Sequence, residues 1–524
     1  PEINYESFTL DNGLTVVVHE DRKVPMVAVN VWYHVGSKNE KVGKTGFAHL
    51  FEHLMFNGTE NYNSEYFEPF EKIGSTDQNG TTNSDRTNYF QNVPTNAVDL
   101  ALWMESDRMG HLLGVVDQEK LDEQRGVVQN EKRQGENQPY GKAFTRISEA
   151  AFPKGHPYSW TTIGSMEDLD AASLEDVQEW FKTYYGPNNA VLALAGDIDL
   201  ETAREKVKKY FGDIPAGPPL IKPDVWIAKR SEEKRDIMYD NVPQARIYKA
   251  WNVPPRDTEA AAHFDLASSV LVGGKNSPLF KELVYEKQIA TSVSAFYYDR
   301  EIAGMFIVVV DVVSGQEPKI VEKEMDAVLQ TFIQKGPNKK LLEAEKTKTL
   351  ASFIRGTQRI GGFGGKSDLL ATCQTYTGNP GCYINNARYI DESTPAKIKS
   401  TFTKWIDDTP YVLTILPSEK LATNESTIDR SEGIPYPTEK ISFKFPSLQT
   451  AELSNGAKVV LAERKNIPLV EINIQFDFGY AQEDADQIGY TNFMMDMLNE
   501  GTKKYSSLEF DEVLDSLGAN MGFG

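Results

Sequence analysis

Runs of apolar residues along the first 220 positions predict a mixture of strands and helices. Val-rich runs at 15–19 and 26–35 predict two strands, and the apolar run at 190–195 predicts a third. Apolar positions with a helical period predict helices in four segments: 46–56, 97–112, 118–134 and 200–211. Because strands and helices mix irregularly, we expect an α+β fold of two-layer domains, in which an antiparallel-rich sheet packs against helices.

The rest of the chain contains a second unit and the start of a third. A strand-like run at 305–313 is followed by helical patterns around 320–335 and 340–355. Polar segments with prolines and without periodicity predict the boundaries. We therefore expect four parts: a first domain at 1–218, a second domain at 219–418, a linker at 419–446 and the start of a third domain at 447–524.

An internal repeat relates the first and third parts. The segment Phe8–Val18 reads FTLDNGLTVVV, and Ala451–Leu461 reads AELSNGAKVVL, at a constant offset of 443 residues. The same offset relates Gly58 to Gly501, so the similarity is sustained along the chain. We expect two full domains followed by an incomplete copy of the first.

Composition narrows the possible functions. The chain has 76 acidic and 55 basic residues, a net charge of −21, and 40% apolar residues. Nucleic acid and anionic membranes attract basic proteins, so neither is an expected partner. Because no apolar run approaches the roughly 18–20 residues of a membrane span, no membrane span is expected. Cys373 and Cys382 are too few for a disulfide framework, but they could form one disulfide in an oxidising compartment.

The most informative local pattern is His49-Leu-Phe-Glu52-His53. On a helix these three polar side chains fall within one sector of roughly 100°. The apolar residues fall on the opposite side: Phe47, Leu50, Phe51 and Leu54. Histidines spaced i, i+4 can reach one tetrahedral metal ion, and Glu52 can accept a proton from a water on that ion. The alternative is a helix with two ordinary surface histidines.

A catalytic zinc site needs a third protein ligand and an open position for water. Glu131 is a candidate, because it shares one predicted helix face with Gln124 and Val128. Glu123 on the same predicted helix competes with it.

The motif resembles that of the inverted-motif (HxxEH) zinc metallopeptidases, the family of pitrilysin, insulin-degrading enzyme and the mitochondrial processing peptidases. The match consists of His49, Glu52 and His53, followed by Glu131 78 residues after His53. The resemblance implies His49, His53 and Glu131 as ligands of one Zn²⁺ and Glu52 as the general base. It also implies a clamshell of two similar halves, of which this chain carries the first half and the start of the second.

A second match lies between the two parts of the predicted metal site. In the resembling family, the asparagine at the position of Asn79 begins an edge strand that pairs with the peptide substrate. This implies substrate contacts for Asn79 and Thr82. A peptide strand added to an open edge gains main-chain hydrogen bonds whatever its side chains. The alternative is a polar turn that enters a strand.

The sequence thus predicts a zinc-dependent endopeptidase that hydrolyses extended or unfolded peptides. Its further partner would be a second clamshell half, in the same chain or in a partner subunit. The alternative is an inactive peptide-binding scaffold, because the second copy has Asn492, Met495 and Asp496 in place of the motif. The resemblance to exported bacterial members implies a periplasmic location, with the cytoplasm as the alternative.

Overall fold

The computed structural model describes residues 2–406, 409–418, 447–463 and 469–524. Of these, residues 2–406, 409–418 and 492–524 belong to one compact unit, and the described residues from 447 to 491 belong to another. The predicted linker at 419–446 lies outside the described residues, and the predicted domain boundaries stay predictions.

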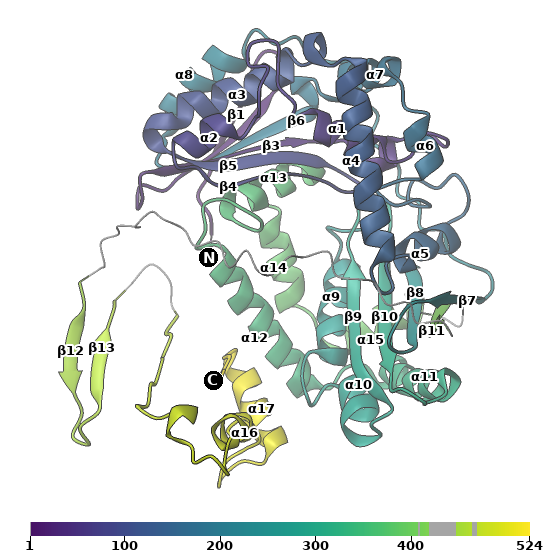
Figure 1. Ribbon diagram of the computed structural model, residues 1–524, viewed down its shortest axis with the longest axis vertical. Coiled ribbons are helices and arrows are strands. Elements are labelled where there is room, and N and C mark those ends of the chain that lie inside the picture. The colour runs from purple at the N-terminus through teal and green to yellow at the C-terminus, as the bar shows by residue number, and fades with distance from the viewer. Residues whose placement is uncertain (1, 407–408, 419–446, 464–468) are drawn as a thin grey trace. The chain divides into compact units, whose positions relative to one another are not determined.

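The first unit contains two mixed sheets that pack against helices, which confirms the expected α+β fold class (Figure 1). The first sheet has the strand order β1-β2-β6-β3-β5-β4, and only the pair β2–β6 is parallel. Its strands are β1 Glu6–Thr9, β2 Thr15–Glu20, β3 Met26–Tyr33, β4 Thr76–Thr82, β5 Thr87–Pro94 and β6 Ala190–Gly196. Strands β3, β5 and β6 are almost entirely buried, whereas β4 pairs with β5 alone among the described strands and forms a free edge.

Helices α1 and α3 cover one face of this sheet, and their apolar side chains form the first core with those of β2, β3 and β6 (Figure 1). The helices of this part of the chain are α1 Phe47–Leu54, α2 Glu68–Lys72, α3 Val98–Gly110, α4 Gln118–Asn137, α5 Ala143–Ala151, α6 Met166–Asp170, α7 Leu174–Tyr184 and α8 Leu200–Phe211. The predicted strands and helices of the first 220 residues are therefore present, with ends that shift by a few residues.

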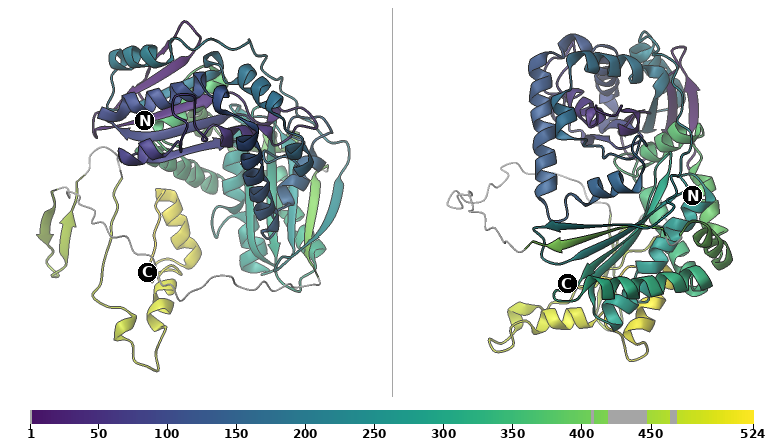
Figure 2. Two further views of the ribbon diagram at one scale, coloured as in Figure 1. Left: turned by 45° about the horizontal axis from the view of Figure 1, so that its top comes forward. Right: turned by 90° about the vertical axis from the view of Figure 1, so that its right-hand side faces the viewer.

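The second sheet has the strand order β7-β11-β8-β10-β9, with one parallel pair, β11–β7 (Figures 1 and 2). Its strands are β7 Lys234–Asp240, β8 Arg246–Val253, β9 Ala290–Tyr298, β10 Gly304–Val312 and β11 Tyr411–Pro417. The helices that follow β8 and β10 are α9 Glu259–Val272, α10 Pro278–Phe280, the π-helix Lys281–Glu286, α11 Pro318–Lys335, α12 Lys339–Gly356, α13 Lys366–Thr377, α14 Tyr383–Asp391 and α15 Pro395–Trp405. Helices α9, α11 and α15 bury the apolar side chains of one face.

Each sheet receives a helix from the other part of the chain on its second face. Leu370 and Ala371 of α13 pack with Val17, Trp32 and other residues of the first sheet, and α13 lies beneath that sheet in Figure 1. Ala143, Ile147 and Ala150 of α5 pack in the same way on the second sheet. A disulfide between Cys373 and Cys382 joins α13 to the start of α14. The two sheets are therefore tied together by exchanged helices.

The second copy of the repeat contains the same early elements. Strands β12 Gln449–Glu452 and β13 Lys458–Leu461 pair antiparallel, as β1 and β2 do at the offset of 443. Helix α16 Tyr490–Met497 corresponds to α1 at the same sequence offset, and α17 Ser507–Leu517 follows. Within the part of the chain that the structure describes, no helix is both long and apolar enough to cross a membrane.

Candidate metal centre

Helix α1 carries the two histidines, and its position is fixed at its N-terminus. Gly46 precedes the helix at φ +85°, and a Cβ there would lie 2.6 Å from the carbonyl oxygen of Ile163. The buried carboxylate of Glu40 accepts hydrogen bonds from the backbone N–H groups of Gly46 (3.1 Å) and Ala48 (2.8 Å). These N–H groups have no partner within the helix, so a carboxylate is a favourable cap.

The apolar residues expected behind the histidines are all buried: Phe47, Leu50, Phe51 and Leu54. This face packs into the first core, so the opposite face directs His49 and His53 away from it. The two rings meet edge to face with centroids 4.8 Å apart.

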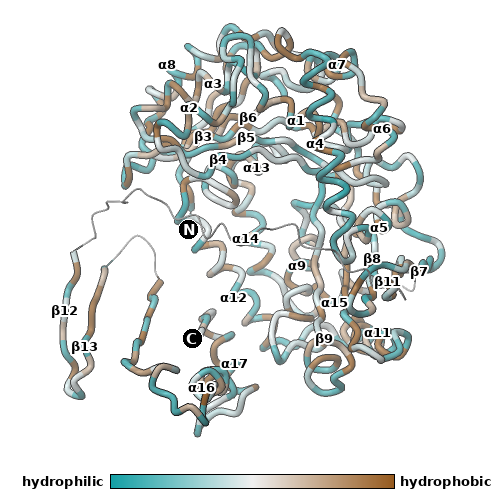
Figure 3. The backbone as a smooth tube through the Cα atoms, viewed as in Figure 1, coloured by the Kyte–Doolittle hydropathy of each residue, from teal (hydrophilic) through white to brown (hydrophobic). Residues whose placement is uncertain are grey.

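Helix α4 supplies the carboxylate that meets the histidines. Figure 3 shows α4 as mostly hydrophilic, and its buried residues are few: Leu121, Gln124, Val128 and Lys132. The Oε2 atom of Glu131 lies 3.6 Å from His49 Nε2 and 3.5 Å from His53 Nε2, and the two nitrogens lie 3.3 Å apart. Among the described residues, His49, His53 and Glu131 form a group that could hold a metal ion, and Glu123 is not part of it.

The donor atoms fit a tetrahedral zinc ion. Two nitrogens bound at about 2.0–2.1 Å with tetrahedral geometry lie about 3.3–3.4 Å apart. The observed nitrogen–nitrogen distance is 3.3 Å, and the two nitrogen–oxygen distances exceed it by only a few tenths of an ångström. Burial and the neighbouring His53 lower the pKa of His49 to about 4, so its imidazole is neutral at pH 7 and can donate a lone pair to a metal.

Glu52 lies beside the three donors and has a different environment. Its carboxylate is buried, and Oε2 accepts a 2.6 Å hydrogen bond from the hydroxyl of Thr82 at the end of β4. Burial raises the pKa of Glu52, although the Thr82 hydrogen bond and the charges of His53 and Arg86 oppose this shift. A buried carboxylate next to a metal site is suited to accept and return a proton.

The two predicted substrate residues both lie on the edge strand β4. Thr82 contacts Glu52, whereas Asn79 is exposed and its side-chain oxygen accepts a 2.9 Å hydrogen bond from the N–H of Gly80. The structure therefore places Thr82 in the surroundings of the metal centre and Asn79 farther along the free edge. Their contacts with substrate stay a prediction.

Sequence reasoning missed Glu40, which caps α1. The repeat contained the signal, because Glu483 stands 443 residues later. Its carboxylate accepts hydrogen bonds from Gly489 (2.7 Å) and Thr491 (2.5 Å), the equivalents of Gly46 and Ala48. The cap is thus present in both copies, whereas the candidate metal ligands are present only in the first.

Comparison with known proteins shows the family to which the chain is related. The model of the insulinase peptidases (peptidase family M16) matches residues 15–163 and, again, residues 458–522. The model of the peptidase M16 inactive domain matches residues 171–349. The first of these models therefore matches both copies of the repeat.

Individual relatives agree with this result. The zinc protease PqqE of Helicobacter pylori is 29% identical over 357 residues, which are 67% of this chain and 79% of that protein. The uncharacterized zinc protease YmxG of Bacillus subtilis is 25% identical over 69% of this chain and 88% of its own length.

Solved structures share the fold. A protease from Helicobacter pylori has a TM-score of 0.72 at 25% identity and covers 79% of this chain and 99% of its own. The first half of the periplasmic protease PqqL from Escherichia coli has a TM-score of 0.63 at 18% identity and covers 79% of this chain and 92% of its own. The chain belongs to the M16, or insulinase, family of peptidases.

Proposed function

We propose that this protein is a zinc-dependent endopeptidase that cleaves extended or unfolded peptides. One observation carries the proposal: donor atoms of His49, His53 and Glu131 converge within 4.8 Å of one another, beside the buried carboxylate of Glu52. Relatives named zinc proteases support it.

Each residue of the proposed centre has a separate role in peptide hydrolysis. Zn²⁺ held by His49, His53 and Glu131 would act as a Lewis acid and lower the pKa of a water at its open position toward about 7. Glu52 accepts a proton as water attacks the peptide carbonyl, and then delivers that proton to the leaving amine. Because Thr82 holds Oε2 of Glu52, we assign the proton transfer to Oε1.

The free edge of β4 favours an extended substrate. A peptide that pairs with β4 would gain main-chain hydrogen bonds, and its scissile bond would lie near the Thr82 end, where Glu52 is. Asn79, exposed on the same strand, would contact the peptide farther from the metal. Folded proteins rarely offer a free extended segment, so unfolded peptides are the preferred substrates.

The protein would also have a second clamshell half as a partner, and it would be exported from the cytoplasm. This chain covers 56% of the length of the periplasmic protease PqqL from Escherichia coli, which supports a second clamshell half, in the same chain or in a partner subunit, as a further partner. The disulfide between Cys373 and Cys382 supports an oxidising compartment such as the periplasm.

The test is peptide cleavage by the zinc-loaded protein and its Glu52→Gln variant. We expect kcat/KM to fall by about 10²–10⁴-fold, since a general base contributes about that much, while zinc content and peptide affinity stay unchanged. Glu123→Gln, an exposed change on α4, is the matched control and should cleave normally. A Glu52→Gln variant that cleaves at the wild-type rate would remove the general-base role.

The alternative, an inactive peptide-binding scaffold, makes a different prediction. Its basis is the match of residues 171–349 to an inactive M16 domain. In that case the wild-type protein would bind both zinc and unfolded peptide, and no cleavage would be detected.

A further inference from the structure

The tip of the hairpin between β4 and β5, residues 83–86, connects the general base to the second sheet. We infer that Asp85 and Glu301 are positioning residues, through which the second sheet holds this tip and thereby holds the hydroxyl of Thr82 against Glu52. This inference rests on the proposed function, because it concerns the orientation of the proposed general base.

The position of the hairpin tip decides where Thr82 lies. Thr82 is the last residue of β4, directly before the tip, and its hydroxyl donates the 2.6 Å hydrogen bond to Glu52 Oε2. Because β4 is an edge strand, only β5 supports it within the sheet. Edge hairpins without other support are mobile, so the tip needs contacts from outside the sheet.

The first domain supplies part of this support. Backbone N–H groups of Ser37 and Lys38 donate to the carbonyl oxygens of Asn83 (3.1 Å) and Ser84 (2.9 Å). The ammonium group of Lys38 donates to the carbonyl oxygen of Asp85 at 2.9 Å. The side chain of Lys38 is 2% exposed and that of Asp85 is 3% exposed, so these contacts are shielded from water.

The second sheet supplies the rest, through the loop between β9 and β10. The N–H of Glu301 donates to Asp85 Oδ2 at 3.1 Å, and the hydroxyl of Tyr158 donates to Asp85 Oδ1 at 2.5 Å. The N–H of Ile302 donates in turn to the Tyr158 hydroxyl at 2.9 Å. Both oxygens of the Asp85 carboxylate are therefore held directly or indirectly by this loop.

The side chain of Glu301 contacts residues of the first domain. Its carboxylate accepts a 2.8 Å hydrogen bond from His34 and forms an ion pair with Lys38. Lys38 thus lies between two carboxylates, Asp85 and Glu301, and a buried cation is tolerated because both partners are close. The loop and the hairpin tip are coupled by charge as well as by hydrogen bonds.

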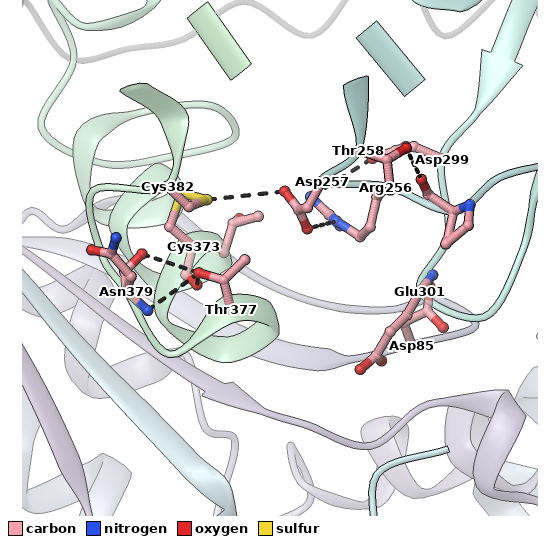
Figure 4. A network of polar contacts seen from close by, with 12 residues as sticks. Asp85, Arg256, Asp257, Thr258, Asp299, Glu301, Cys373, Thr377, Asn379 and Cys382 are labelled. Carbon is pink, nitrogen blue, oxygen red and sulfur yellow. Dashed lines mark hydrogen bonds and ion pairs between the residues drawn. A yellow bond between two sulfur atoms is a disulfide. The ribbon is translucent and has the colours of Figure 1, made fainter. Parts of the chain in front are cut away.

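Figure 4 shows the residues around the loop that carries Glu301. Glu301 lies near Asp85, and the backbone N–H of Arg256 donates to the carbonyl oxygen of Arg300, the residue before Glu301, at 3.0 Å. The side chain of Arg256 pairs with Asp257 at 3.1 Å, and the sulfur of Cys382, which is part of the disulfide, lies 4.0 Å from Asp257 Oδ1. The loop that holds the hairpin tip is itself braced, which makes it a suitable support for a catalytic group.

The test compares Asp85→Asn and Glu301→Gln with wild-type protein, each also in a Thr82→Val background. We expect kcat to fall by about 10–100-fold in the single variants, because small displacements of catalytic groups have effects of that size, with KM and zinc content unchanged. In the Thr82→Val background neither substitution should lower kcat further, because the connection to Glu52 is already absent.

The control is Glu322→Gln. Glu322 of α11 forms a buried ion pair with Lys249 of β8 at 3.0 Å, so this change also removes a buried carboxylate charge. It should leave kcat unchanged. A decrease of kcat that is as large in the Thr82→Val background as in wild-type protein would overturn the inference.

Hydrogen exchange gives a second readout that does not require activity. Amides of residues 80–90 should exchange faster in Asp85→Asn and Glu301→Gln than in wild-type protein, and not in Glu322→Gln. Unchanged exchange would overturn the inference even if cleavage fell. Absence of cleavage by zinc-loaded wild-type protein would instead reject the proposed function, and exchange would still decide whether the second sheet holds the tip.

Discussion

The pKa values of Glu52, which is buried, and of Glu301, which is partly buried, shift in opposite directions because the surroundings of the two carboxylates differ. Glu52 has a raised pKa, since burial outweighs its hydrogen bond from Thr82. Burial also opposes ionisation of Glu301, yet the hydrogen bond from His34 and the charge of Lys38 lower its pKa to about 2. The first arrangement suits proton transfer, and the second suits a permanent structural charge.

Glu301 should make the free energy of unfolding depend on pH within a defined acidic range. Its pKa is about 2 in the folded protein against 4.5 for an unperturbed glutamate, so its ionised form stabilises the fold above pH 4.5. This contribution is lost as the pH falls from about 4.5 toward 2. We expect Glu301→Gln to lower the free energy of unfolding by on the order of 3 kcal/mol at pH 7, and by much less near pH 2.5.

Urea denaturation of wild-type protein and Glu301→Gln at both pH values would measure this difference. A difference in the free energy of unfolding that is equal at pH 7 and pH 2.5 would show that the charge of Glu301 does not stabilise the fold.

At the scale of elements, α1 depends on contacts beyond its own eight residues. The cap from Glu40 holds its first turn, its apolar face packs into the first core, and α4 approaches with Glu131. The second copy has the equivalent cap from Glu483 but lacks the candidate metal ligands. The cap therefore serves the fold of this helix in both copies, and in the first copy it also fixes where the histidines lie.

Removal of the cap from the first copy should weaken zinc binding, whereas removal of the cap from the second copy should not. Glu40→Ala leaves two buried N–H groups without their acceptor, so we expect a loss of about 1–3 kcal/mol in the free energy of unfolding. Displacement of His49 should lower zinc affinity by about 10–100-fold, measured by competition with a chelator.

Glu483→Ala is the control from the same chain, since it removes the equivalent cap from a helix without histidines. It should leave zinc affinity unchanged. Equal zinc affinity in Glu40→Ala and wild-type protein would contradict a role of the cap in placing the histidines.

At the scale of the whole molecule, the sequence predicted what depends on neighbouring residues and missed what depends on distant ones. Four strands and six helices followed from local periodicity, among them β3, α1 and α4, and the grouping of His49, His53 and Glu131 followed from helix spacing and the family resemblance. The packing of α5 on the second sheet and of α13 on the first could not be predicted, because each helix leaves the part of the chain that surrounds it. The contact of Glu301 with Asp85 joins residues 216 positions apart and leaves no local pattern.

The most direct test of the metal centre is the zinc content of the purified protein, measured by mass spectrometry beside two variants. We predict one zinc per chain in the wild-type protein, none in His49→Ala, and one in His111→Ala. His111 is the control because its half-exposed ring lies 3.9 Å from Glu60 and outside the donor group. Wild-type protein without zinc after zinc is supplied, or His49→Ala that keeps it, would contradict the metal centre and with it the proposed peptidase.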